Sequence, residues 1–152
     1  MKKRSILLTS LILLLCLALL CGCQRKPKMI VGELSDLNVR DDLGITLTVD
    51  AKTLTREGAA FAFSNETSSP CHYGDDFRLE VWTDDGWHSI EAVPYYLFMG
   101  ENQATGEPAE LSLDWSADCG KLPKGEYRLL ADILPSEGKD AEPFYVSCEF
   151  AF

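Results

Sequence analysis

The sequence predicts an all-β protein, an antiparallel β-sandwich of about seven to eight strands, from three observations. Short runs in which apolar and polar residues alternate recur from residue 44 to the end of the chain. Residues that favour turns, chiefly Gly, Pro, Asp and Asn, separate these runs. No stretch beyond residue 22 has the apolar spacing of an amphipathic helix. Because alternation gives each strand one apolar face, such strands are expected to pack as two sheets around a core.

The first 22 residues have the layout of a secretory signal peptide. Lys2 to Arg4 form a basic start, and the apolar run at 6–20 is shorter than the roughly 20 residues of a membrane-spanning helix. The run ends in Leu-Cys-Gly-Cys at 20–23, which resembles the bacterial lipobox. This resemblance implies that Cys23 is lipid-modified and holds the protein on the extracytoplasmic face of the cell membrane. The alternatives are an ordinary secretory signal and an uncleaved anchor.

The chain that follows the signal peptide is acidic and has the length of one domain. Without the first 22 residues, 130 of the 152 remain. The signal peptide removes three of the 14 basic residues and none of the 24 acidic ones, so the formal net charge changes from −10 to −13. This charge argues against a nucleic-acid partner. The predicted organisation is a signal peptide at 1–22, a lipid-anchored tether and leading arm at 23–43, and one domain at 44–152.

The elements of the mature chain can be predicted in order. Residues 24–28 are polar and basic, as in a short linker at a membrane surface. Residues 29–40 fit either a leading edge strand or an extended arm. A long connection at 94–108 is apolar at its start and polar afterwards. The strands predicted from alternation are 44–50, 59–63, 77–82, 87–90, 110–115, 128–134 and 144–150.

The strands at 77–82 and 87–90 are predicted to form a hairpin. Asp85-Gly86 between them is typical of a type I′ turn, because Gly readily adopts the positive φ that this turn needs. In the first of these strands Phe77, Leu79 and Val81 share one face. This alternation places Trp82 on the opposite face.

A tyrosine corner is predicted where the chain enters the strand at 128–134. Pro123 and Gly125 mark a turn, and Tyr127 follows at the mouth of the strand. In a tyrosine corner the ring is buried and its hydroxyl bonds to backbone of the preceding connection. Antibody domains have a Cys two residues after this Tyr, whereas here the residue is Leu129. The pattern favours an immunoglobulin-like sandwich without the inter-sheet disulfide; the alternative is an ordinary turn before a strand.

Several short motifs together resemble a known family. They occur in the order Tyr-Gly-Asp-Asp-Phe at 73–77, Leu-Glu at 79–80, Asp-Gly-Trp at 85–87 and Gly-Lys-Leu-Pro-Lys-Gly-Glu-Tyr-Arg-Leu at 120–129. This series resembles the bacterial immunoglobulin-like domains of lipoproteins and surface proteins of Gram-positive bacteria, over residues 44–152. Cys119 departs from the pattern, because an aromatic residue is more usual there. The resemblance implies a fold and an extracytoplasmic location, and no catalytic residue.

Three cysteines remain in the mature domain after Cys23 is set aside. In an immunoglobulin-like sandwich the loop that holds Cys119 and the end of the strand that holds Cys148 lie at the same end. A disulfide between Cys119 and Cys148 is therefore one prediction, and two buried thiols are the other. Cys71 would be left over at the opposite end, where it could pair with another chain.

No constellation of residues indicates a metal, a cofactor or catalysis. Cys71 and His72 are adjacent, so on an extended chain their side chains point apart, and His88 is the only other imidazole. The acidic pairs at 75–76 and 84–85 lack the spacing of a calcium loop and fit solvated turns. We therefore expect no metal site, no cofactor and no enzyme activity.

Trp82 is the predicted candidate for an interaction surface, because an exposed aromatic residue is a common anchor for a partner. The alternative is that the aromatic residues cover a sheet edge and fill the core. The function expected is a non-catalytic binding or scaffolding role at the cell envelope, with an envelope protein or a glycan as partner. The alternatives are an inhibitor or accessory subunit of an envelope enzyme and a small envelope hydrolase.

Overall fold

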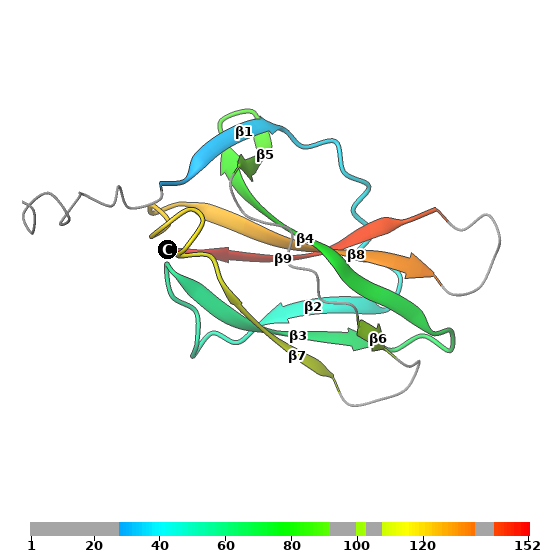
Figure 1. Cartoon of the computed structure of the whole chain (residues 1–152). Coiled ribbons are helices and arrows are strands. Elements are labelled where there is room, and N and C mark those ends of the chain that lie inside the picture. The colour runs from blue at the N-terminus through cyan, green and yellow to red at the C-terminus, as the bar shows by residue number, and fades with distance from the viewer. Residues whose placement is uncertain (1–27, 92–99, 103–107, 136–141) are drawn as a thin grey trace, which may run out of the picture.

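The computed structural model describes residues 28–91, 100–102, 108–135 and 142–152, and these residues form strands joined by turns and loops (Figure 1). They contain no helix long and apolar enough to cross a membrane. The strands are β1 (Ile30–Leu34), β2 (Ile45–Val49), β3 (Gly58–Asn65), β4 (Cys71–Thr83), β5 (Gly86–Glu91), β6 (Gly100–Asn102), β7 (Ala109–Asp114), β8 (Glu126–Pro135) and β9 (Phe144–Ala151).

The strands form two antiparallel sheets that pack face to face (Figure 1). The larger sheet has the order β1-β5-β4-β8-β9, with β6 paired to β4, and the smaller sheet has the order β2-β3-β7. This arrangement confirms the prediction of an immunoglobulin-like β-sandwich. All seven predicted strands are present. The two others are β6, which lies in the long connection, and β1, which shows that residues 30–34 are an edge strand.

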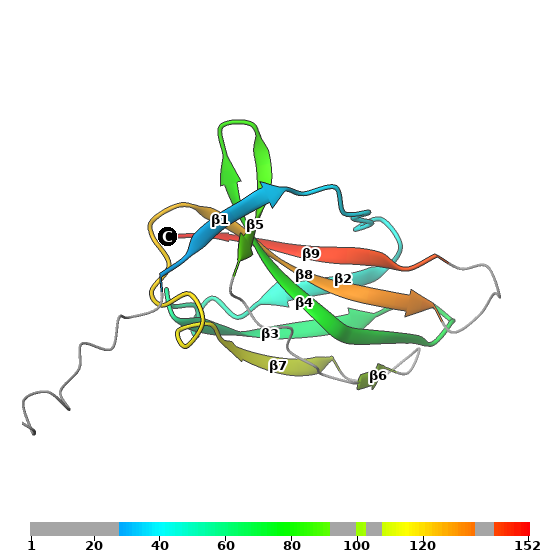
Figure 2. The ribbon, with the colours of Figure 1, turned by 45° about the horizontal axis from the view of Figure 1, so that its top comes forward.

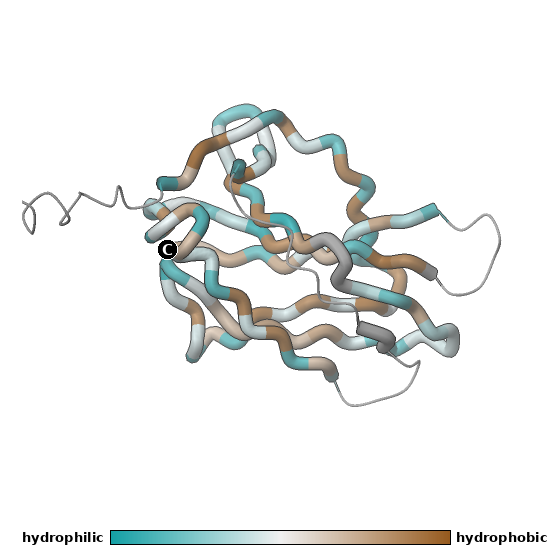
Figure 3. Tube along the Cα trace, in the orientation of Figure 1, coloured by the Kyte–Doolittle hydropathy of each residue, from teal (hydrophilic) through white to brown (hydrophobic). Residues whose placement is uncertain are grey.

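The core lies between the two sheets and is built from the apolar faces that alternation predicts. Figure 3 shows apolar and polar positions following one another along the strands. Phe61 and Phe63 of β3 face Phe77 and Leu79 of β4 in one buried cluster. Tyr73 joins this cluster and stacks on Phe63, with the ring centroids 3.9 Å apart. Each large apolar side chain buried here contributes roughly 1.5–3 kcal/mol to stability.

Strand β4 is much longer than predicted because a bulge interrupts its alternation. Tyr73 pairs with Ile133 of β8, and Phe77 pairs with Ala131, so three residues of β4 lie opposite a single residue of β8. The two extra residues keep Tyr73 and Phe77 on the same face. The sequence Gly-Asp-Asp at 74–76 reads as a loop, which is why the first part of the strand was not predicted.

The hairpin between β4 and β5 is present, but its turn lies one residue earlier than predicted. Thr83 pairs with Gly86, so Asp84 and Asp85 are the two central residues. Gly86 has a φ of 142° and is the first residue of β5. The positive φ expected of this Gly is therefore used at the start of the strand instead of inside the turn.

Tyr127 has the geometry of a tyrosine corner. Its ring is buried, and its hydroxyl donates a hydrogen bond of 2.9 Å to the carbonyl oxygen of Pro123. The ring also stacks with Phe150 of β9, at a centroid distance of 6.0 Å. A Cβ atom added at Gly125 would lie 3.5 Å from the Tyr127 ring, which is an ordinary contact. There is therefore enough space for a larger residue than Gly at position 125.

Candidate interaction surface

The most prominent surface feature of the sandwich is an arm formed by its outermost strands. We call β1, β5 and residues 80–85, which end β4 and form the turn, the hairpin arm. Figure 2 shows the hairpin standing clear of the two packed sheets, with β1 alongside β5. The three large apolar side chains of β1, Ile30, Val31 and Leu34, are all exposed. Strand β1 is therefore open to solvent, whereas Val81 and Ile90 fix the base of the arm in the core.

Two tryptophans dominate the outer face of the arm. Trp82 of β4 and Trp87 of β5 are direct partners across the two strands, and their rings make an edge-to-face contact at 5.2 Å. Trp82 is 48% exposed, whereas Phe77, Leu79 and Val81 are buried in the core. Trp82 therefore faces away from these three residues, as the alternation predicted.

A buried ion pair packs against the tryptophan pair. Glu80 and Arg128 are direct partners on β4 and β8, and Arg128 places Nε and Nη2 each 2.7 Å from Oε2 of Glu80. Glu80 is only 1% exposed. The Arg128 guanidinium lies 4.7 Å from the centroid of the Trp87 ring, in a cation–π contact. Sequence reasoning missed this group, although both residues occupy outward positions of their strands.

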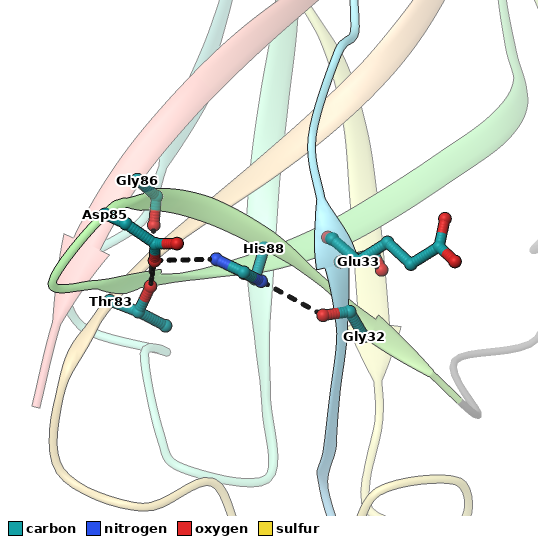
Figure 4. A network of polar contacts seen from close by, with 7 residues as sticks. Gly32, Glu33, Thr83, Asp85, Gly86 and His88 are labelled. Carbon is teal, nitrogen blue, oxygen red and sulfur yellow. Dashed lines mark hydrogen bonds and ion pairs between the residues drawn. The ribbon is translucent and has the colours of Figure 1, made fainter.

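On the other face of the arm, His88 joins the hairpin turn to β1 (Figure 4). Nε2 of His88 lies 2.9 Å from Oδ1 of Asp85, and Nδ1 lies 3.0 Å from the carbonyl oxygen of Gly32. The Thr83 hydroxyl donates a further bond of 2.7 Å to Oδ1 of Asp85. The Gly32 bond, followed by the Asp85 bond, raises the pKa of His88, and the bonds from Thr83 and His88 lower the pKa of Asp85.

The three cysteines of the domain are free, buried thiols. Burial raises the pKa of each, that of Cys119 to about 11. A protonated, buried thiol is a poor nucleophile. Cys71 is covered by the core and receives a hydrogen bond from Nδ2 of Asn65 at 3.5 Å, which corrects the expectation that it could pair with another chain.

The predicted disulfide between Cys119 and Cys148 is not formed in the structure, and the register of β9 explains why. Cys119 donates a bond of 3.3 Å to the carbonyl oxygen of Trp115. The residue of β9 that packs on Trp115 is Phe150, at a centroid distance of 6.0 Å. Cys148 lies two residues farther into the strand, roughly 7 Å away along the backbone, and its thiol lies beside Val49 of β2.

The described residues also contain no group of three or more His, Cys, Asp or Glu side chains arranged to hold a metal ion. A shallow depression of about 330 Å³ lies over β3 and β7. Its lining is mixed: the polar residues are Thr53, Thr55, Glu57, Ser112, Asp114 and Ser116, and the others are Gly58, Ala59, Ala60 and Leu113. The depression is open to solvent and brings together no recognisable catalytic set. The hairpin arm is therefore the more distinctive candidate for function.

Two packed antiparallel sheets with a tyrosine corner at the start of β8 define an immunoglobulin-like domain. The family described as Bacterial Ig-like domain matches residues 41–147, and the chain belongs to this family. No curated protein matches the chain. Domains of this family are generally non-catalytic, and membership suggests a role outside the cell. The resemblance that the motifs predicted is thus confirmed at the level of the domain family.

Proposed function

We propose that this protein is a lipid-anchored module on the extracytoplasmic face of a bacterial cell membrane. In this role it binds or scaffolds another envelope component and catalyses no reaction. The lipobox-like sequence around Cys23 supports the anchor, and the family supports a location outside the cell. Cys23 precedes Ile30 by seven residues, so the chain between the lipid and β1 spans at most about 25 Å. The hairpin arm is therefore held near the membrane.

The observation that carries the proposed binding role is that Trp82 is exposed to solvent and yet held in place by neighbouring side chains. A tryptophan that is half exposed and free to move would lose conformational entropy on binding. Trp82 instead packs against Trp87, which in turn packs on Arg128, and Arg128 is tied to the buried Glu80. This series of contacts holds an apolar ring in place on an open surface, which is the character of a binding hot spot.

The test is in-cell cross-linking of the tagged, full-length protein, followed by mass spectrometry of the proteins and glycans recovered with it. We expect Trp82→Ala to reduce recovery of the main partner by about tenfold or more, as for a hot-spot residue. The matched control is Leu134→Ala, because Leu134 is similarly exposed (45%) but lies at the far end of β8. Equal recovery with wild-type protein and Trp82→Ala would exclude this surface as the binding site.

The projecting hairpin favours a second candidate function, that of an inhibitor or accessory subunit of an envelope enzyme. Loops that stand clear of a sandwich are suited to enter the cleft of another protein. In this arm the turn carries Asp84 and Asp85, both exposed. A single stoichiometric enzyme partner, whose activity changes when this protein is added, would select this function. A glycan as the main partner would select the scaffolding role.

A further inference from the structure

Strand β1 is held to the sandwich mainly by polar contacts. Its three large apolar side chains are exposed, so their burial contributes little to its attachment. β1 pairs only with β5, and its register slips between Val31 and Leu34. A Cβ atom added at Gly32, in the bulge, would lie 2.3 Å from Oγ of Ser89, so a larger residue there would have to displace the Ser89 side chain. The slip places the Gly32 carbonyl oxygen where the His88 side chain binds it.

Both ring nitrogens of His88 face hydrogen-bond acceptors, and neither faces a donor. Nδ1 faces the Gly32 carbonyl oxygen, and Nε2 faces the Asp85 carboxylate (Figure 4). A neutral imidazole has one N–H and can donate only one of these bonds, whereas the imidazolium ion donates both. The geometry therefore fits protonated His88. Loss of the proton breaks one bond and removes the positive charge of the donor from the other.

The charged groups around His88 act in the same direction. Asp85 contacts the ring from the turn, and Glu80 acts on it through its charge from the neighbouring strand β4. From β1 the ring receives the Gly32 carbonyl oxygen, while the side chain of Glu33 points away from it (Figure 4). Arg128 lies against Trp87 and is paired with Glu80. The pKa of His88 is accordingly raised above its usual 6.5, with the Gly32 bond as the first cause.

We infer that His88 is a pH-dependent clamp, which binds edge strand β1 to the hairpin turn when it is protonated and loosens when it loses its proton. The direction of the pH dependence follows from the linkage between closing of the clamp and proton binding by His88. Closure raises the affinity of His88 for a proton, so the clamp acts fully below about pH 6.5 and weakens as the pH rises through the higher pKa of the closed state. An open β1 uncovers the edge of β5, which offers unpaired backbone groups to a partner strand. The clamp itself does not depend on the proposed lipid anchor or on Trp82.

The test is amide hydrogen exchange, read by mass spectrometry, on the mature protein between pH 5.5 and 8.5. Exchange rates are corrected for the intrinsic effect of pH, and β8 serves as the internal reference. We expect the protection of residues 30–35 to fall severalfold as the pH rises, because the closed state binds the proton more tightly than the open state does. Protection of β8 is expected to stay constant.

Three variants make the test specific to the clamp. His88→Gln should remove the pH dependence, because Gln does not titrate in this range. Asp85→Asn should move the midpoint to lower pH, since the imidazolium loses its anionic partner. His72→Gln, which changes the only other histidine, should leave the pH dependence intact. A constant protection of residues 30–35 in the wild type, or the same pH dependence in His88→Gln, would overturn the inference.

Discussion

Tyr127 joins β8 to the turn before it through a single hydroxyl group. The hydroxyl is enclosed with the ring, and its bond to the Pro123 carbonyl oxygen ties the start of the strand to the connection. Its other polar neighbour is the sulfur of Met29, at 3.8 Å, which is a weak acceptor. Removal of the hydroxyl therefore leaves the Pro123 carbonyl oxygen without this donor, while the ring keeps its contacts.

We expect Tyr127→Phe to lower the free energy of unfolding by about 1 kcal/mol, the usual net contribution of a buried hydrogen bond. Urea or thermal unfolding measures the change. Gly125→Ala is the comparison variant, because its added methyl group makes only ordinary contacts with the ring. An unchanged melting temperature in Tyr127→Phe would mean that the corner bond contributes nothing to stability.

The burial of the three cysteines depends on residue type, whereas disulfide formation between them depends on the fold. Their burial could be anticipated from the residue type, because Cys is among the residues most often buried, and Cys148 also alternates with Val146 and Phe150. Whether two of them bond depends on the distance between them, and this distance depends on the register of β9 against the turn after β7. A shift of two residues along β9 is enough to decide whether Cys119 and Cys148 form a disulfide or remain free thiols.

Among the elements, the pairing of β4 with β8 sets the surface of the hairpin arm. The register places Glu80 opposite Arg128. Trp82 follows two residues later in β4, where it pairs with Trp87 of β5. The carboxylate of Glu80 can be buried because the Arg128 guanidinium neutralises its charge and donates hydrogen bonds to it. The sheet therefore contains a charged pair in place of the apolar pair that would also fit such a site.

We expect Arg128→Met to destabilise the domain by about 3 kcal/mol or more, because Glu80 would remain buried without its partner. The double variant Glu80→Leu with Arg128→Met should recover much of this loss, since it replaces both charges by apolar groups. Chemical denaturation of the wild type, both single variants and the double variant measures the coupling. Additive losses in the double variant would contradict a buried, paired charge.

At the scale of the whole molecule, the arm, the membrane anchor and the sandwich have separate roles in the proposed function. The sandwich supplies a rigid support, and its two sheets bury the large apolar side chains. The hairpin arm carries the exposed aromatic surface and the proposed His88 clamp. β1 begins seven residues after Cys23, so the proposed anchor and the proposed clamp belong to neighbouring parts of the chain.

We expect Cys23→Ala to move the protein from the membrane fraction to the soluble or secreted fraction, because the lipid is the proposed attachment. Cys21→Ala is the matched control and should leave the protein in the membrane fraction, since Cys21 belongs to the predicted signal peptide. Fractionation with detection of a C-terminal tag measures both. Retention of Cys23→Ala in the membrane would contradict the lipid anchor and favour an uncleaved one.

The sequence by itself determined seven of the strands and which side of each faces the core, but it left β1 open and did not predict β6 or the first part of β4. Alternation is a local property, so Phe61, Leu79 and Trp82 could be assigned to a face without knowledge of their partners. The tertiary structure alone decided how the strands meet. The bulges in β1 and β4, the Glu80–Arg128 pair and the His88–Gly32 bond all depend on register between segments far apart in the chain. Register results from the packing of the whole domain, and no short stretch of sequence specifies it.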